Sequence, residues 1–413
     1  MAGPSGWDRN AAGFTLFLVG AAAIVASANA WLVYVAAFRD GVRYNAVGAD
    51  WMVFHSAARL FLDGRLETIF DGGRLTAYLN RTYQAWLPMT IVYRPWVYPP
   101  SYLLLVAPFG FLGFVASYVS FQLVTAAALV AALTVGAGKD ARAACLIAAA
   151  ALLSPAAVDN FGAGQNAFLI AALLIAGFRL LNRRPVFAGL ILGVLTIKPQ
   201  FALMAPIALI AARQWPALLA AAGSALLLAL VSALIFGVDP WAIWLSQAMS
   251  SLAASDLQWT RFGRMWGDSV WTCAILLGAA PAAASLAQLA ATVWAAGAVA
   301  VAWRRPLSEG SKLAVLLAAT LLAAPYWSSY DAILLALAGL FLLAEAPRNG
   351  DLWAWVLALA LWLAPVASPP VQTPIGRLIP IAIAAFIAFA LWPQRWRATV
   401  SAAAGEPRPA QSV

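Results

Sequence analysis

The sequence predicts an all-α membrane protein, a polytopic bundle of roughly ten to twelve transmembrane helices. Of its 413 residues, 64% are hydrophobic and only 10% are charged, and the mean hydropathy is +0.84. A soluble domain carries about 45–50% apolar and about 25% charged residues. Because so few charges cannot cover a water-exposed surface, the surplus apolar surface must face lipid.

The first expected helix covers residues 14–38. An Ala-Asn-Ala sequence at 28–30 resembles a signal-peptidase site, but the apolar run continues past it, so we expect an uncleaved helix. The long polar stretch 39–100 follows. It contains amphipathic pieces at 51–62 and 74–86, which we expect to lie on or near the membrane surface.

From residue 100 onward the chain is nearly continuous apolar helix. Several expected spans are shorter than the roughly 20 residues that a crossing needs. Lys198-Pro199 separates two of the short pieces, and we expect a broken or re-entrant hairpin there, with its turn inside the protein, because irregular backbone at membrane depth must be buried or line a cavity. The expected spans are 113–135, 143–157, 165–182, 187–197, 200–212, 216–236, 282–303, 312–325, 329–345, 351–366 and 376–393.

Lysine and arginine in the short loops predict the orientation. Those that we assign to the cytoplasmic side are Lys139, Arg142, Arg179, Arg183, Arg184, Arg213, Arg304, Arg305, Lys312, Arg348, Arg395 and Arg397. If the apolar piece 268–280 does not cross, both termini are cytoplasmic and the 39–100 loop faces outward. We expect residues 1–396 to form one membrane domain and 397–413 a disordered cytoplasmic tail.

Several classes of function are disfavoured. The net charge of +9 does not indicate nucleic-acid binding, because the arginines lie between hydrophobic spans and form no basic face. Cys145 and Cys273 lie in apolar stretches and predict neither a disulfide framework nor a metal site. The sequence contains no P-loop, GxGxxG, HExxH, GxSxG or Asp-x-Asp motif, so we expect no cofactor, no bound metal and no site for a soluble nucleotide donor.

Polar groups at membrane depth are the candidate functional residues. By the predicted topology they all map to the outer face, and a cluster on one side is what an active-site cavity needs. They are Asp50, His55, Arg94, Tyr98, Gln165, Asn166, Lys198, Tyr326, Tyr330 and Asp331.

Structural interpretations compete with these functional ones. The structural alternative for Asp50 is the N-cap of a helix that begins at Trp51. For Lys198 it is a side chain that snorkels to the membrane interface. His55 suits a hydrogen-bonded structural group on a short helix.

Other polar residues have structural alternatives too. Gln165 and Asn166 suit a helix cap or interhelical hydrogen bonds, and Asp331 suits a structural ion pair. Trp86 and Trp96 suit either interfacial anchors or platforms for a sugar ring.

Four segments together resemble glycosyltransferase family 87 of the GT-C superfamily, in the order found in that family. The segments are Ala49-Asp50-Trp51-Met52-Val53-Phe54-His55 with Ala57-Ala58 and Asp63-Gly64; Pro95-Trp96-Val97-Tyr98-Pro99-Pro100 with Pro108; Gly164-Gln165-Asn166 with Gly189, Gly193 and Lys198-Pro199-Gln200; and Ala324-Pro325-Tyr326 with Tyr330-Asp331.

The resemblance implies a GT-C helix bundle that transfers a hexose, typically mannose, from a polyprenyl-phosphate sugar to a lipid or glycan acceptor. Transfer is expected on the outer side of a bacterial inner membrane, with Asp50 as general base and inversion at the anomeric carbon. The remaining candidates would bind the donor phosphate or the substrate. Many members carry a histidine near the fourth segment, where this chain has Ser328-Ser329-Tyr330-Asp331.

Two other classes of function stay open. A polytopic bundle with a broken helix also describes a transporter or flippase, although we find no inverted internal repeat that would support it. A non-catalytic membrane scaffold is the other, and it predicts that Asp50 and Lys198 lie far apart.

Overall fold

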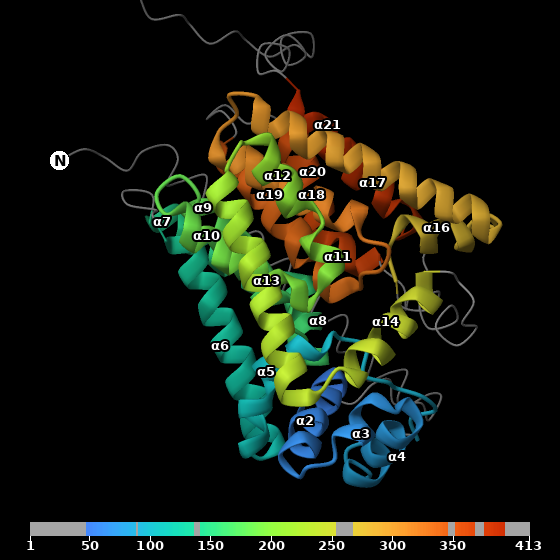
Figure 1. Cartoon of the computed structure of the whole chain (residues 1–413). Coiled ribbons are helices and arrows are strands. Elements are labelled where there is room, and N and C mark those ends of the chain that lie inside the picture. Colours follow the sequence, from blue (N-terminus) through green and yellow to red (C-terminus); the bar gives the residue numbers. More distant parts are fainter. Residues whose placement is uncertain are drawn as a thin grey trace, which may run out of the picture.

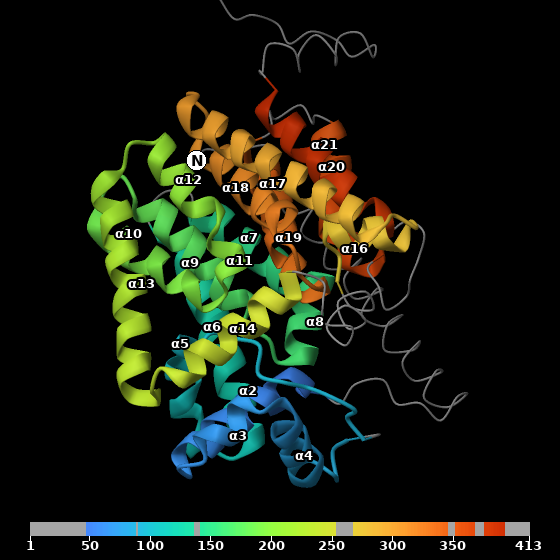
Figure 2. The same ribbon diagram turned by 45° about the vertical axis from the view of Figure 1, so that its right-hand side comes forward.

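The computed structural model describes residues 47–87, 90–135, 141–252, 267–345, 352–367 and 376–392. These ranges are largely helical and contain no strand, which confirms the predicted all-α polytopic bundle (Figures 1 and 2). The expected first span at 14–38, the amino-terminal part of the 39–100 loop and the tail 397–413 lie outside the described residues.

A layer of three helices covers one end of the bundle, at the bottom of Figure 1. It consists of α2 (Ala49–Leu62), α3 (Leu66–Phe70) and α4 (Gly72–Thr82). The sequence predicted short helices here, but α2 does not lie on a surface. Most of its side chains are buried, and it packs against α5 (Pro100–Val106) and η1 (Ala107–Phe111).

Three helices are long and apolar enough to cross a membrane by length and composition. They are α6 (Phe114–Thr134), α13 (Trp215–Phe236) and α17 (Pro281–Arg304). The bent pair α7 (Ala141–Leu152) and α8 (Pro155–Ala163) makes a fourth if it is one span. Seven further apolar helices of 10–17 residues lie in the described part of the chain, so many of the expected spans are short, as the sequence indicated.

Helix α8 lies largely in the gap between the expected spans 143–157 and 165–182, where the sequence predicted a loop. Ser154 accepts a hydrogen bond from the Ala157 backbone N–H, and Pro155 occupies the first helical turn, so a new helix starts at this point. The axis turns by 59° between α7 and α8. Gly164 ends α8 with a φ of 76°, a left-handed conformation that glycine adopts without strain.

The expected break at Lys198-Pro199 is present. The chain runs toward the α2–α4 layer through α10 and η3, and returns through α11 and α12 (Figure 1). Lys198 lies at the vertex and is buried, so the turn of this hairpin is inside the protein. The elements around it are α9 (Ala167–Leu180), α10 (Pro185–Gly193), η3 (Val194–Ile197), α11 (Pro199–Ala202) and α12 (Met204–Ala211).

The carboxyl-terminal part contains the buried centre of the bundle and some helices that are too short to span. Helices α18 and α19 are almost completely buried, whereas α16 is much too short to cross a membrane. The bounds are α14 (Asp239–Leu252), α16 (Val270–Leu276), α18 (Glu309–Ala323), η4 (Ser329–Ala332), α19 (Ile333–Glu345), α20 (Leu352–Ala367), η5 (Gly376–Leu378) and α21 (Ile379–Leu391).

Several of the lysine- and arginine-rich turns meet at the end of the bundle opposite the α2–α4 layer. Arg179 at the end of α9 pairs with Glu309 at the start of α18, at 3.4 Å, and also donates to the Leu133 carbonyl near the end of α6. Arg305 after α17 donates to the Leu391 carbonyl at the end of α21, at 3.0 Å. The bundle therefore has one basic end and one end covered by α2–α4.

Close contact between α10 and α13 depends on glycine. A Cβ atom built on Gly189 would lie 2.1 Å from the Ala217 carbonyl oxygen, and one on Gly193 would lie 2.4 Å from that of Ala221. Small residues let membrane helices approach closely. We predict that Gly193→Val separates the helices and lowers the free energy of unfolding by about 1–3 kcal/mol.

Thermal unfolding in detergent measures this effect. Gly223→Val is the matched control, because a Cβ at Gly223 on α13 meets nothing within 4 Å. Equal midpoints for the two variants would contradict the packing argument.

Candidate active site

Asp50 lies in the first turn of α2 and makes two contacts far along the chain. One carboxylate oxygen pairs with Arg94 Nη2 at 2.5 Å, and the other accepts from Gln165 Nε2 at 2.8 Å. The N-cap position belongs to Gly48, and no side chain caps this helix. The carboxylate is therefore held by tertiary contacts, and the capping interpretation does not apply.

Arg94 reaches Asp50 from the irregular segment that precedes α5. Its backbone N–H donates to Thr76 Oγ1 at 2.9 Å, and Nη1 donates to the Ala49 carbonyl at 3.3 Å. Its side chain is 19% exposed, as is that of Asp50. Two further hydrogen bonds of Arg94 therefore anchor this partly accessible ion pair.

Gln165 connects Asp50 to Tyr98. Its Oε1 atom accepts from the Tyr98 hydroxyl at 3.0 Å and from the Asn166 backbone N–H at 3.3 Å. Asn166 occupies the N-cap position of α9, but its side chain makes no capping hydrogen bond. Gln165 thus uses its side chain to hold Asp50 rather than to cap a helix.

A second ion pair joins Lys198 at the hairpin vertex to Asp331 on η4. The Lys198 Nζ–Asp331 Oδ1 distance is 2.6 Å, and the two side chains are 5% and 1% exposed. The other Asp331 oxygen accepts from the Ser328 backbone N–H at 3.1 Å. The ammonium also lies over the rings of Phe201 and Tyr330, which add cation–π attraction. Lys198 therefore does not snorkel to an interface.

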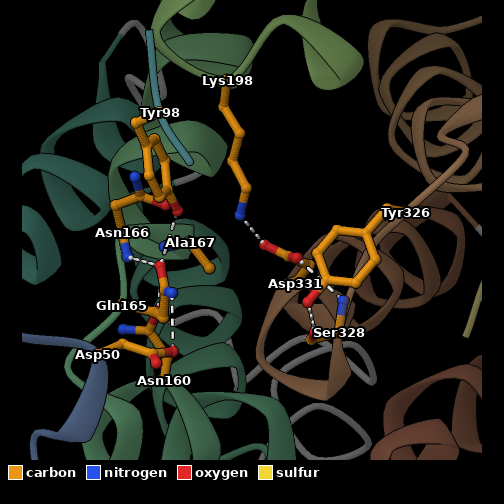
Figure 3. A network of polar contacts seen from close by, with 10 residues as sticks. All are labelled: Asp50, Tyr98, Asn160, Gln165, Asn166, Ala167, Lys198, Tyr326, Ser328 and Asp331. Carbon is orange, nitrogen blue, oxygen red and sulfur yellow. Dashed lines mark hydrogen bonds and ion pairs between the residues drawn. The ribbon is translucent and has the colours of Figure 1, made fainter. Parts of the chain in front are cut away.

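Figure 3 shows the Lys198–Asp331 pair in the same polar centre as Asp50, Gln165 and Tyr98, and Asp50 carries the second ion pair with Arg94. Tyr326 lies within electrostatic range of both. Burial raises the pKa of Tyr326 to about 12, and the carboxylates of Asp50 and Asp331 act in the same direction. Burial likewise raises the pKa of Tyr98, again with contributions from both carboxylates.

We use the name polar centre for Asp50, Arg94, Tyr98, Gln165, Lys198, Tyr326 and Asp331. Its members come from the amino-terminal layer, the segment before α5, the turn after α8, the hairpin vertex and the segment around η4. It lies toward the α2–α4 end of the bundle, so the structure brings together groups that the sequence assigned to one face.

Some predicted candidates lie outside the polar centre or are packed against it. Both ring nitrogens of His55 are engaged elsewhere, with the Tyr83 hydroxyl at 2.8 Å and the Leu112 carbonyl at 3.0 Å, and burial lowers its pKa. Trp96 is 1% exposed and stacks on Tyr102, whereas Trp86 is 55% exposed and contacts Phe114. His55 is thus a structural connector in this arrangement.

Two buried amide residues next to the polar centre escaped the sequence analysis. Gln122 on α6 and Asn160 on α8 are 3% and 0% exposed. A glutamine in the middle of a 21-residue apolar helix was a usable signal, because polar side chains at membrane depth are rarely incidental. Asn160 lay in a segment that we expected to be a loop.

The Lys198–Asp331 pair generates a stability prediction. Replacing one partner leaves a buried charge without compensation, so Lys198→Met or Asp331→Asn should each lower the free energy of unfolding by about 3–5 kcal/mol. Lys198→Met combined with Asp331→Leu removes both charges and should recover most of that loss. Thermal unfolding of the three variants in detergent tests this, and an additive loss in the double variant would contradict it.

One of three comparisons with known proteins gave a match. The sequence model of glycosyltransferase family 87 matches residues 96–325, more than half of the chain. The matched range includes Tyr98, Gln165 and Lys198 and begins after Asp50. Searches of curated proteins and of solved structures gave no match. The chain therefore belongs to glycosyltransferase family 87 and is a multi-pass membrane glycosyltransferase.

Proposed function

We propose that this glycosyltransferase moves a hexose, mannose by family resemblance, from a polyprenyl-phosphate sugar to a hydroxyl of a lipid or glycan acceptor. The reaction takes place on the outer side of a bacterial inner membrane. One observation carries the proposal: two carboxylate–cation pairs lie in one polar centre toward one end of the bundle. A lipid-borne donor presents its phosphate and its anomeric carbon near the membrane surface, where such a centre can reach them.

Asp50 is the general base of this mechanism. It is 19% exposed, whereas Asp331 is 1% exposed, so an acceptor hydroxyl reaches Asp50 more readily. A general base must come within hydrogen-bond reach of the proton that it removes. Asp331 instead holds Lys198 in place beside the reaction.

The cations Lys198 and Arg94 stabilise the phosphate that leaves. The bond between the anomeric carbon and the phosphate oxygen breaks while the acceptor oxygen forms a new bond to that carbon. The acceptor proton passes to Asp50, and the bond electrons pass to the phosphate. Fixed cations aimed at developing charge are an effective form of catalysis. Lys198 and Arg94 would supply that stabilisation.

The Asp50–Arg94 pair links proton transfer to departure of the phosphate. Once Asp50 takes the proton it is neutral, and Arg94 no longer has a charged partner there. The phosphate gains one negative charge in the same step, so the guanidinium can exchange a carboxylate for a phosphate oxygen. Arginine suits this exchange because its donors match both groups. The net charge of the polar centre and its substrates then stays constant through the reaction.

Single displacement by the acceptor inverts the anomeric centre. The transition state resembles an oxocarbenium ion, as in glycoside hydrolysis. Tyr98 and Tyr326 each interact electrostatically with Asp50 and Asp331, and in this proposal they contact the sugar.

We predict that Asp50→Asn lowers kcat by about 10²–10⁴-fold, because the amide cannot accept the proton. The assay follows radiolabelled sugar from a polyprenyl-phosphate hexose into lipid acceptors, with purified protein in proteoliposomes. Asp63→Asn is the matched control, because Asp63 is an exposed carboxylate at the end of the same helix, and its 3.9 Å ion pair with Arg59 is exposed and therefore weak.

Retained turnover in Asp50→Asn with normal expression would exclude Asp50 as the base. If the wild-type protein moved the intact donor across the bilayer without transferring its sugar, the flippase interpretation would replace the transferase one.

A further inference from the structure

Three helices meet through a buried chain of amide hydrogen bonds that the proposed chemistry does not use. The Ala167 backbone N–H donates to Asn160 Oδ1 at 3.0 Å, and Asn160 Nδ2 donates to Gln122 Oε1 at 3.0 Å. Gln122 Nε2 then donates to the Gln165 backbone carbonyl at 3.0 Å. The chain thus connects α6, α8 and the start of α9 to the residue that contacts Asp50.

The direction of this chain is fixed by its ends. A backbone N–H can only donate, so the Asn160 atom that faces Ala167 must be the oxygen. The Asn160 amide nitrogen then faces Gln122, which must present its oxygen. The Gln122 nitrogen is left for the Gln165 carbonyl, which can only accept. Each amide therefore has one orientation that satisfies every contact.

The Gln165 side chain is oriented by the same logic. Its Oε1 atom accepts from the Asn166 backbone N–H, which can only donate, so its amide nitrogen must face Asp50. The turn itself approaches α2 closely: a Cβ atom on Gly164 would lie 2.6 Å from the Cβ of Trp51. A small shift of this turn would therefore change the Gln165–Asp50 contact.

We infer that Gln122 and Asn160 are positioning residues, which act through Gln165 to hold the Asp50 carboxylate in its reactive orientation. The inference rests on the proposed role of Asp50 as general base. Neither residue needs to touch the substrate. Buried amides without hydrogen-bond partners are costly in free energy. The amide hydrogen bonds therefore favour one arrangement of the turn at Gly164 and Gln165 over its alternatives.

The test substitution removes the two hydrogen bonds of the Gln122 side chain. Gln122→Met keeps the length of the side chain and removes both hydrogen-bonding groups, so it should release the turn.

A double-mutant cycle with Gln165→Met tests the inference. We expect Gln122→Met and Gln165→Met each to lower kcat by about 10- to 100-fold, with little change in the KM for the polyprenyl-phosphate sugar, because a small misplacement of a reacting group has costs of this size. Since both act on the same contact, the double variant should match the slower single variant. Multiplicative losses, or a Gln122→Met protein with wild-type kcat, would overturn the inference.

Thr125→Val is the matched control on α6. Thr125 is buried one turn from Gln122, and its hydroxyl donates only to carbonyls of its own helix, those of Phe121 and Gln122. It should keep wild-type kcat.

An experimental structure of the Gln122→Met protein in nanodiscs decides the inference without any assay. We expect Gln165 Nε2 to leave hydrogen-bond distance of Asp50, and an unchanged 2.8 Å contact would overturn the inference even if no sugar transfer were detected. Absence of transfer by the wild-type protein would instead count against the proposed function alone.

Discussion

The pairing of charges in a poorly solvated place is the constraint on which the rest of this structure depends. A carboxylate or an ammonium taken out of water is unstable unless an opposite charge and hydrogen bonds compensate for the lost solvation. Asp50 meets this condition through Arg94 and Gln165, and Lys198 meets it through Asp331. Each pair joins segments that lie far apart in the sequence, so satisfying these charges also fixes how the elements around them meet.

The breaks in the helices provide the positions for those charges. A continuous helix at residues 185–211 would place Lys198 among neighbouring side chains, whereas the break at Pro199 puts it at a buried vertex. Pro155 and Gly164 begin and end the short helix α8. This helix ends beside α2, where the next residue, Gln165, contacts Asp50. The long helices α6, α13 and α17 form a framework whose apolar surface suits lipid, and α6 also contributes Gln122 to the hydrogen bonds behind Gln165.

Much of this organisation was predictable from the amino-acid sequence. The remainder depends on contacts between residues that lie far apart in the sequence. Hydropathy and composition predicted the bundle, and the short pieces around Lys198-Pro199 predicted the buried hairpin. The selection of Asp50, Lys198 and Asp331 followed from the rarity of charge at membrane depth. Their partners did not follow, because whether Arg94 contacts Asp50 or solvent depends on how the segment before α5 folds back. Helix α8 was expected to be a loop, since nine residues are too few to indicate a span.

The central claim is that the polar centre receives a lipid-linked sugar phosphate with its cations and an acceptor hydroxyl with Asp50. The most direct measurement is an experimental structure of the protein with a non-transferable polyprenyl-phosphonate hexose in a lipid nanodisc. Our account predicts that the phosphonate contacts Lys198 and Arg94 and that the anomeric carbon faces Asp50. A phosphonate bound at the basic end of the bundle, or one separated from Asp50 by packed helices, would contradict it.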